Sequence, residues 1–140
     1  MASRILTASL LGLEAHPVTI EADISAGLSA FVIVGLPDAS VQEAKERVKS
    51  AMKHADVPFP RTRVIVNLAP ADLKKCGTPF DLPIALSILS AQGTVPEDLT
   101  SRLFAGELGL DGSLRPIHGA LSLVLAAKRL GIQEIVLPEG

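Results

Sequence analysis

A helix that is apolar on almost every side constrains the fold of this chain more than any other feature. Its apolar set follows a polar loop and comprises Leu82, Ile84, Ala85, Leu86, Ile88 and Leu89. Such a helix must be surrounded by protein, so the segment predicts the centre of a hydrophobic core. The β-branched run 64–66 predicts a buried strand before the loop. Asp81 is placed to cap the helix, with Pro83 in the first turn, where no N–H partner is needed.

The N-terminus of this helix admits two interpretations. Free N–H groups and the positive end of the helix dipole are a common setting for a nucleophile or an anion site. The same arrangement is also an ordinary helix cap, which is the more frequent case. Spacing alone favours the cap and leaves both interpretations open.

The composition predicts one domain over residues 1–140, located in the cytoplasm. Of the 140 residues, 48% are hydrophobic, which is enough to build one core without disulfides or metals. The single cysteine, Cys76, excludes an internal disulfide, and no apolar run approaches the roughly 18 residues of a membrane span. The N-terminus lacks the charged start and the cleavage site of a signal peptide. Because the net charge is −2, nucleic-acid binding would require a local basic face.

Two N-terminal runs predict an antiparallel pair of strands. Residues 18–24 alternate between apolar and polar side chains, and residues 4–11 form the other β-like run. A third strand is predicted over residues 31–34, where the absence of polar alternation indicates burial on both faces.

A long helix is predicted after the turn at residues 35–38, with Ser40 and Glu43 at capping-box spacing. Its apolar stripe recurs at helical intervals and comprises Val41, Ala44, Val48, Ala51, Met52 and Ala55. The charged side chains between them predict a solvated face, on which Glu43 can pair with Arg47 one turn later.

The C-terminal third predicts a strand over residues 103–110, a hairpin turn at Asp111-Gly112 and a last helix. That helix follows Pro116 and stops at Gly131, and its apolar set is Leu121, Leu123, Val124, Leu125, Ala127 and Leu130. Residues 135–137 predict a closing strand. Together the elements predict an α+β fold, a mixed β-sheet with its helices packed on one face.

Few residues in the chain suggest catalysis, nucleotide binding or metal binding. There is no G-x-x-x-x-G-K-[ST] phosphate loop and no G-x-S-x-G nucleophile motif. The three histidines are far apart and lie in no metal-binding pattern, so we expect no metal and no other cofactor in this chain. Cys76 follows two lysines, which favour a thiolate, but no sequence partner marks it as a nucleophile.

Basic residues gather at both ends of the predicted central strand. Arg61 and Arg63 lie at its beginning, and Lys74 and Lys75 follow its end. Either pair suits contact with phosphate, and either is equally compatible with a solvated edge. A second candidate group on the long helix comprises Lys45, Lys49 and Lys53.

Four motifs resemble one family of bacterial proteins. They are V-G-L-P at 34–37, A-K-E-R-V at 44–48, N-L-A-P-A-D-L-K-K at 67–75 and F-D-L-P-I-A at 80–85. Along its whole length the chain is similar to the N-terminal domain of the Mg-chelatase-like AAA+ ATPases of the YifB or ComM family. The resemblance implies an AAA+ module beyond residue 140 that uses ATP and Mg²⁺. It also implies a hexameric ring that engages DNA for branch migration in recombination during natural transformation.

A more distant resemblance is to Lon proteases and to the Lon-like domain of RadA, which share the ribosomal protein S5 domain 2-like fold. It is clearest in A-G-E-L-G-L-D-G-S-L-R-P-I at 105–117 and extends to I-V-L-P at 135–138. Lon proteases use a serine nucleophile at the mouth of the buried helix and a lysine base early in the last helix. Those positions correspond to Asp81 and Leu121, and neither side chain can perform the required chemistry. The resemblance therefore implies a degenerate dyad.

Two functional hypotheses follow. The preferred one is a non-catalytic domain that helps its AAA+ module form a ring and guides DNA, with no membrane partner. Its candidate phosphate contacts are Arg61, Arg63, Lys74 and Lys75. The alternative is a hydrolase of Lon-like fold that uses a non-standard site around Asp72, Cys76 and Asp81.

Overall fold

The predicted pair of N-terminal strands is confirmed. The computed structural model describes residues 2–11, 14–95, 99 and 101–139. Its first two strands, β1 (Ala2–Leu11) and β2 (Glu14–Ser25), run antiparallel, with Ile5 opposite Ile20. Both isoleucines are fully buried on the same face, since residues opposite each other in a sheet point to the same side.

A mixed sheet is built around these two strands. In the described residues it has six strands in the order β3-β4-β2-β1-β5-β8, where β3 is Ala30–Val34, β4 is Arg63–Ala69, β5 is Arg102–Phe104 and β8 is Glu134–Val136. Strands β3 and β4, β1 and β5, and β5 and β8 pair in parallel, and the other two pairs are antiparallel. The predicted mixed sheet and α+β class are confirmed.

The prediction that residues 31–34 are buried on both faces is wrong. Strand β3 lies at the edge of the sheet. Phe31 and Ile33 pack toward the core, whereas Val34 on the other face is 41% exposed. The outward positions carry valines, whose branched side chains suit a strand even where solvent reaches them, and this produced the uniform apolar pattern.

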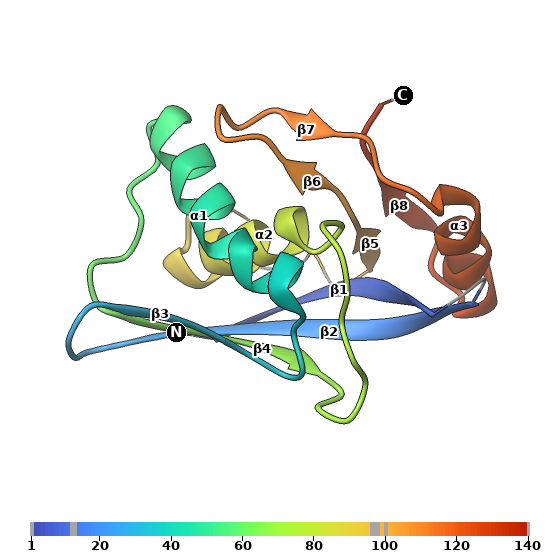
Figure 1. Cartoon of the computed structure of the whole chain (residues 1–140), viewed down its shortest axis with the longest axis horizontal. Helices are drawn as coiled ribbons and strands as arrows, with labels where there is room; N and C mark the ends of the chain where they lie inside the picture. The colour runs from blue at the N-terminus through green and yellow to red at the C-terminus, as the bar shows by residue number, and fades with distance from the viewer. Residues whose placement is uncertain (1, 12–13, 96–98, 100, 140) are drawn as a thin grey trace.

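Two helices cover one face of the sheet. Helix α1 (Ala39–His54) and helix α2 (Asp81–Gln92) pack against each other there (Figure 1). Helix α1 is capped by Asp38, whose carboxylate accepts a hydrogen bond from the Val41 N–H at 2.8 Å. The predicted capping box at Ser40 and Glu43 is therefore wrong.

The third helix, α3 (Ala120–Arg129), packs on the opposite face, so the prediction that the helices share one face is wrong. Its cluster contains Leu6, Ala8 and Leu10 of β1, which alternate along the strand with the inward-facing Ile5. In Figure 1, α3 stands beside one end of the β1–β2 pair, away from α1 and α2. None of the described helices is long and apolar enough to cross a membrane.

The predicted core helix α2 is confirmed. Ile84 and Ile88 have no exposed surface, and the remaining large apolar side chains are partly buried, namely Leu82, Leu86 and Leu89. The helix runs from Asp81 to Gln92, and its C-cap residue Gly93 adopts a left-handed conformation with φ of 80°.

The strand predicted over residues 103–110 is divided into β5 and β6 (Glu107–Leu108). The chain bends between them because Gly106 binds the segment around the start of α2: its N–H donates to Pro79 O at 2.9 Å, and its carbonyl accepts from Leu82 N–H at 3.0 Å. Strand β6 then forms the predicted hairpin with β7 (Leu114–Arg115), where Gly112 has φ of 89°. The bend brings β6 to the mouth of α2.

Candidate functional site

Asp81 does not cap α2 but lies buried beneath its first turn. The N-cap residue is Phe80, which has no capping side chain. The Asp81 carboxylate has no exposed surface and accepts three hydrogen bonds, from Arg47 Nε at 2.6 Å, Arg47 Nη2 at 3.1 Å and the Leu108 N–H at 3.0 Å. A two-pronged guanidinium and a backbone donor occupy both carboxylate oxygens, so this group is already bound within the fold.

Arg47 reaches Asp81 from α1 and makes its side-chain ion pair there, while Glu43 acts on it only as a weaker electrostatic partner. Its Nη2 also donates to Ser40 O at 2.7 Å, and its side chain is only 19% exposed. The hydrogen bond to Asp81 raises the pKa of Arg47. Burial raises the pKa of Asp81, and the bonds from Arg47 and Leu108 oppose that rise. The ion pair thus ties α1, α2 and β6 together at the mouth of the core helix.

Leu121, to which the Lon resemblance assigns the other position of the dyad, lies on the surface. It is 72% exposed at the start of α3, and its neighbours Val124 and Leu125 are exposed as well. In the predicted apolar set of this helix, Leu123 and Ala127 are buried and the other four side chains are not. Helix α3 therefore has an apolar outer face.

Lys75 is fully buried, so the expectation that it contacts phosphate is wrong. Its ammonium donates to the carbonyl of Gly35 at 2.7 Å and to the carbonyl of Pro70. Its backbone N–H donates to Leu36 O at 2.9 Å. Burial lowers the pKa of the Lys75 ammonium. The side chain joins the two loops that carry the V-G-L-P and N-L-A-P-A-D-L-K-K motifs.

The remaining residues of the hydrolase hypothesis do not converge on a free carboxylate. Asp72 is exposed and Cys76 is half-buried in the loop before α2, whereas Asp81 is enclosed by its ion pair. In the part of the chain that the structure describes, no three His, Cys, Asp or Glu side chains are placed to hold a metal ion.

Three basic residues meet at a surface cavity of about 490 Å³ between α1 and the segment 57–61. They are Lys49 and Lys53 of α1 and Arg61, and we call the site the basic cavity. The Lys49 ammonium lies 5.4 Å from the ring centroid of Phe59 and 5.9 Å from that of Phe31. The sequence placed Arg61 and the lysines in separate candidate groups, and the fold brings them together.

The other predicted basic contacts lie elsewhere. Arg63 is exposed on the far face of the sheet, since it alternates with Val64, which is fully buried on the α1 side. Lys74 is exposed beyond the opposite end of β4. Arg61, Arg63 and Lys74 therefore do not form one continuous surface.

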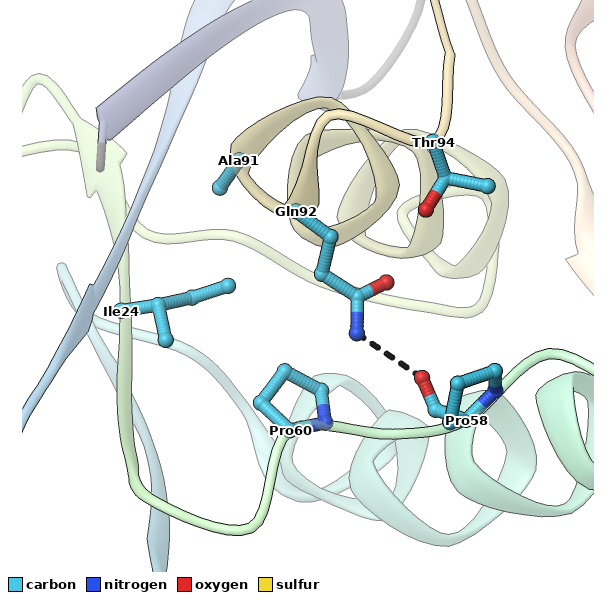
Figure 2. Close-up of a pocket in the computed structure, with 6 residues that line it drawn as sticks. All are labelled: Ile24, Pro58, Pro60, Ala91, Gln92 and Thr94. Carbon is cyan, nitrogen blue, oxygen red and sulfur yellow. Dashed lines mark hydrogen bonds between the residues drawn. The ribbon is translucent and has the colours of Figure 1, made fainter.

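A second cavity lies across the segment 58–60 from the basic cavity and has a volume of about 520 Å³. Figure 2 shows Gln92 reaching across it to donate a hydrogen bond to Pro58 O at 2.8 Å, with Ile24 and Ala91 on its walls. The described residues that line this cavity carry no charge. The two cavities share Pro58 and Pro60, and the basic residues gather on one side of them only.

Comparison with known proteins decides the family. Residues 20–140 match the protein family described as subunit ChlI of Mg-chelatase. The chain belongs to this family. It is 45% identical over 120 residues to the competence protein ComM of Haemophilus influenzae, covering 85% of this chain and 24% of ComM. It is 43% identical over 134 residues to YifB of Salmonella typhimurium, covering 95% of this chain and 26% of YifB.

These matches make this ChlI-family chain a domain of the YifB/ComM type. It spans about a quarter of the length of the curated relatives that it matches. It is also 26% identical over 129 residues to Lon protease 2 of Thermus thermophilus, covering 86% of this chain and 16% of that protease.

Sequence reasoning missed Arg47 as the partner of Asp81. A signal was present, because Arg47 stands three residues after Ala44 and four before Ala51, which puts it at the margin of the apolar stripe of α1. It also lies within the A-K-E-R-V motif. A charged residue at such a margin points toward the core and needs a buried partner.

Proposed function

We propose that this chain is the non-catalytic N-terminal domain, residues 1–140, of a cytoplasmic Mg-chelatase-like AAA+ ATPase of the YifB/ComM type. Its ATP- and Mg²⁺-dependent module follows residue 140, and the whole protein forms a hexameric ring that acts on DNA in recombination, including natural transformation. The domain has the ribosomal protein S5 domain 2-like fold and supports assembly of the ring. It engages DNA through basic surface residues.

The observation that supports this proposal is the state of the two residues that the Lon resemblance assigns to the dyad. At the position of the serine nucleophile, Asp81 is buried and held by Arg47 and Leu108. At the position of the lysine base, Leu121 has no group that takes a proton. What would be a catalytic centre is instead a structural ion pair and an exposed leucine.

The exposed face of α3 supports a role in assembly. Its exposed apolar side chains are Leu121, Val124 and Leu125, followed by the C-cap residue Leu130. A group of exposed apolar side chains on a soluble domain marks a contact with another protein surface. We assign this contact to a neighbouring subunit of the ring, since burying these side chains there would stabilise the assembled state.

Arg61, Arg63 and Lys74 remain the proposed phosphate contacts on the surface, and Lys75 is withdrawn because it is buried. Their contribution would be independent of DNA sequence and sensitive to salt. Since the three lie on different surfaces of the domain, each would touch the DNA at a different place around a ring.

The assembly role is tested in the full-length protein with the double variant L121S/L125S. We expect the ring to dissociate at a subunit concentration at least about tenfold higher than in the wild type, because two apolar contacts are lost. Analytical ultracentrifugation with ATP and Mg²⁺ measures this. The matched control is L28S/L110S, which alters two exposed leucines outside α3.

Two results would contradict the proposal. One is an unchanged assembly midpoint in L121S/L125S, or an equal shift in L28S/L110S. The other is turnover of a peptide substrate by the 140-residue chain that disappears in C76A, which would revive the hydrolase hypothesis.

A further inference from the structure

The basic cavity collects cations from two separate segments. Lys49 and Lys53 come from the last two turns of α1, and Arg61 comes from the segment that leads into β4. The chain as a whole has a net charge of −2, so an excess of cations does not account for this convergence. Three like charges around one hollow repel one another, and an anion bound between them offsets that repulsion.

The basic cavity has no acidic neighbour among the described residues that line it. In the described part of the chain no ion pair joins Lys49, Lys53 or Arg61 to an acid. Glu46, one turn before Lys49 on α1, is not among the residues that line the cavity. The positive charge is therefore available to an external anion.

Two aromatic rings hold one of these cations in place. Phe31 of β3 and Phe59 lie with their ring centroids 5.1 Å apart, and the Lys49 ammonium stands over both rings. A lysine restrained in this way loses less side-chain entropy on binding a ligand than a free surface lysine does. The wall next to it is apolar and is formed by Val57, Pro58 and Pro60.

We propose that the basic cavity binds the phosphates of a single-stranded nucleic acid. This inference rests on the proposed DNA engagement and deepens it, because it names one site and one form of ligand. Cations beside an apolar and aromatic wall are the combination by which proteins hold single strands without reading their sequence. A flexible strand can lower a phosphate into a hollow, whereas a duplex is a stiff rod with its phosphates on a convex surface.

The competing explanation is structural. Lys53 stands in the last turn of α1, where a cation stabilises the helix dipole, and Lys49 packs on two rings. Neither role requires Arg61 or predicts binding of an anion. The experiment therefore uses Lys49 together with Arg61 and measures binding directly.

The test is a titration of the 140-residue chain with oligothymidylate of about 20 nucleotides, followed by amide chemical-shift mapping, which detects weak binding. We expect the shifts to centre on Lys49, Lys53 and Phe59–Arg61. In K49A/R61A the affinity should fall roughly 10- to 30-fold at about 0.1 M salt. The slope of log affinity against log salt should decrease by about 1.4, since each phosphate contact on a single strand contributes about 0.7.

The matched control is R115A/K128A, which also removes two exposed cations and leaves the net charge equal to that of K49A/R61A. Equal losses of affinity in both variants, or chemical-shift changes spread over the whole surface, would contradict binding at the basic cavity. A hairpin duplex that binds as tightly as the single strand would overturn the preference for single strands. Displacement of the oligonucleotide by equimolar inorganic phosphate or thymidine monophosphate would assign the cavity to a small anion.

Failure here is distinguishable from failure of the proposed function. If the chain produces no shifts with the oligonucleotide while L121S/L125S still weakens the ring, the basic cavity is not a nucleic-acid site and the assembly role stands. If K49A/R61A loses affinity for the oligonucleotide while the ring is insensitive to L121S/L125S, the nucleic-acid site is supported and the assembly role is contradicted.

Discussion

Helix α1 contributes cations to two regions, one in which the charge is buried and paired and one in which it is exposed without an acidic neighbour among the described lining residues. At the mouth of α2, Arg47 turns inward, where its guanidinium binds a fully buried carboxylate and a backbone carbonyl. At the basic cavity, Lys49 and Lys53 turn outward and meet Arg61 with no acid among the described residues that line the space. One helix thus carries both a paired internal charge and a group of unpaired surface charges.

The difference shows which charges hold the fold and which are free to bind something else. A buried ion pair stabilises little relative to apolar packing, but removing one partner leaves an uncompensated charge inside the protein. Mutual repulsion among surface cations opposes folding, and a helix-dipole contact at Lys53 or a ring contact at Lys49 does not explain why Arg61 joins them, so their convergence points to a ligand. The predictions below test this division, beginning with the largest expected effect.

Replacement of Asp81 by alanine should destabilise the chain by about 3–5 kcal/mol, because Arg47 would remain largely buried without its counter-charge. Urea denaturation measures the loss. The control E46A removes an exposed acid of α1 and should change the free energy of unfolding by less than about 0.5 kcal/mol.

The double variant R47L/D81L sharpens the same comparison. It removes both charges and keeps apolar volume, so it should be less destabilised than D81A, with a coupling energy on the order of 1–3 kcal/mol. A D81A variant that loses less than about 1 kcal/mol would show that the carboxylate is not needed to balance Arg47.

Replacement of Lys75 by methionine should cost about 1–3 kcal/mol at neutral pH, since the carbonyls of Gly35 and Pro70 lose a buried donor. The pKa of Lys75 is lowered from 10.5 by burial, so between its folded value and 10.5 the unfolded chain binds more protons than the folded chain. The stability contributed by Lys75 therefore rises with pH across that window.

The measurement for Lys75 is urea denaturation at a series of alkaline pH values. The gap between the wild type and K75M should widen as pH rises toward 10.5. The neighbouring exposed residue provides the control K74M, which should show no such widening. A gap that stays constant or narrows with pH would mean that burial does not disfavour the charged form of Lys75.

The local pattern of apolar, polar and turn-forming residues predicted much of the fold. The alternation in residues 18–24 placed β2, the apolar run after Asp81 placed α2, and Asp111-Gly112 placed the β6–β7 hairpin. These features depend on neighbours in the sequence, where the periods of strand and helix are visible. The position of β3 at the sheet edge and of α3 on the opposite face depends on the order of the strands, which no local pattern encodes.

The candidate site was less accessible to sequence reasoning. Asp81 was recognised as important, but its partner Arg47 stands 34 residues earlier. Lys75 is adjacent to Lys74 and identical to it in chemistry, yet one is fully buried and the other is exposed. Such contacts arise only when distant segments pack, so spacing within one segment does not reveal them.

The smallest effect should come from the basic cavity. Replacement of Arg61 by alanine removes a cation that has no acidic partner among the described residues, so the free energy of unfolding should change by less than about 0.5 kcal/mol. Because Arg61 lies near Lys49 and Lys53, the change should be stabilising at low salt. It should fade above about 0.1 M salt, where the screening length is about 10 Å. The control R63A, on the other face of the sheet, should not show this salt-dependent gain. A loss of more than about 1.5 kcal/mol in R61A would give Arg61 a structural role like that of Arg47, and the division between paired and free charge would then fail.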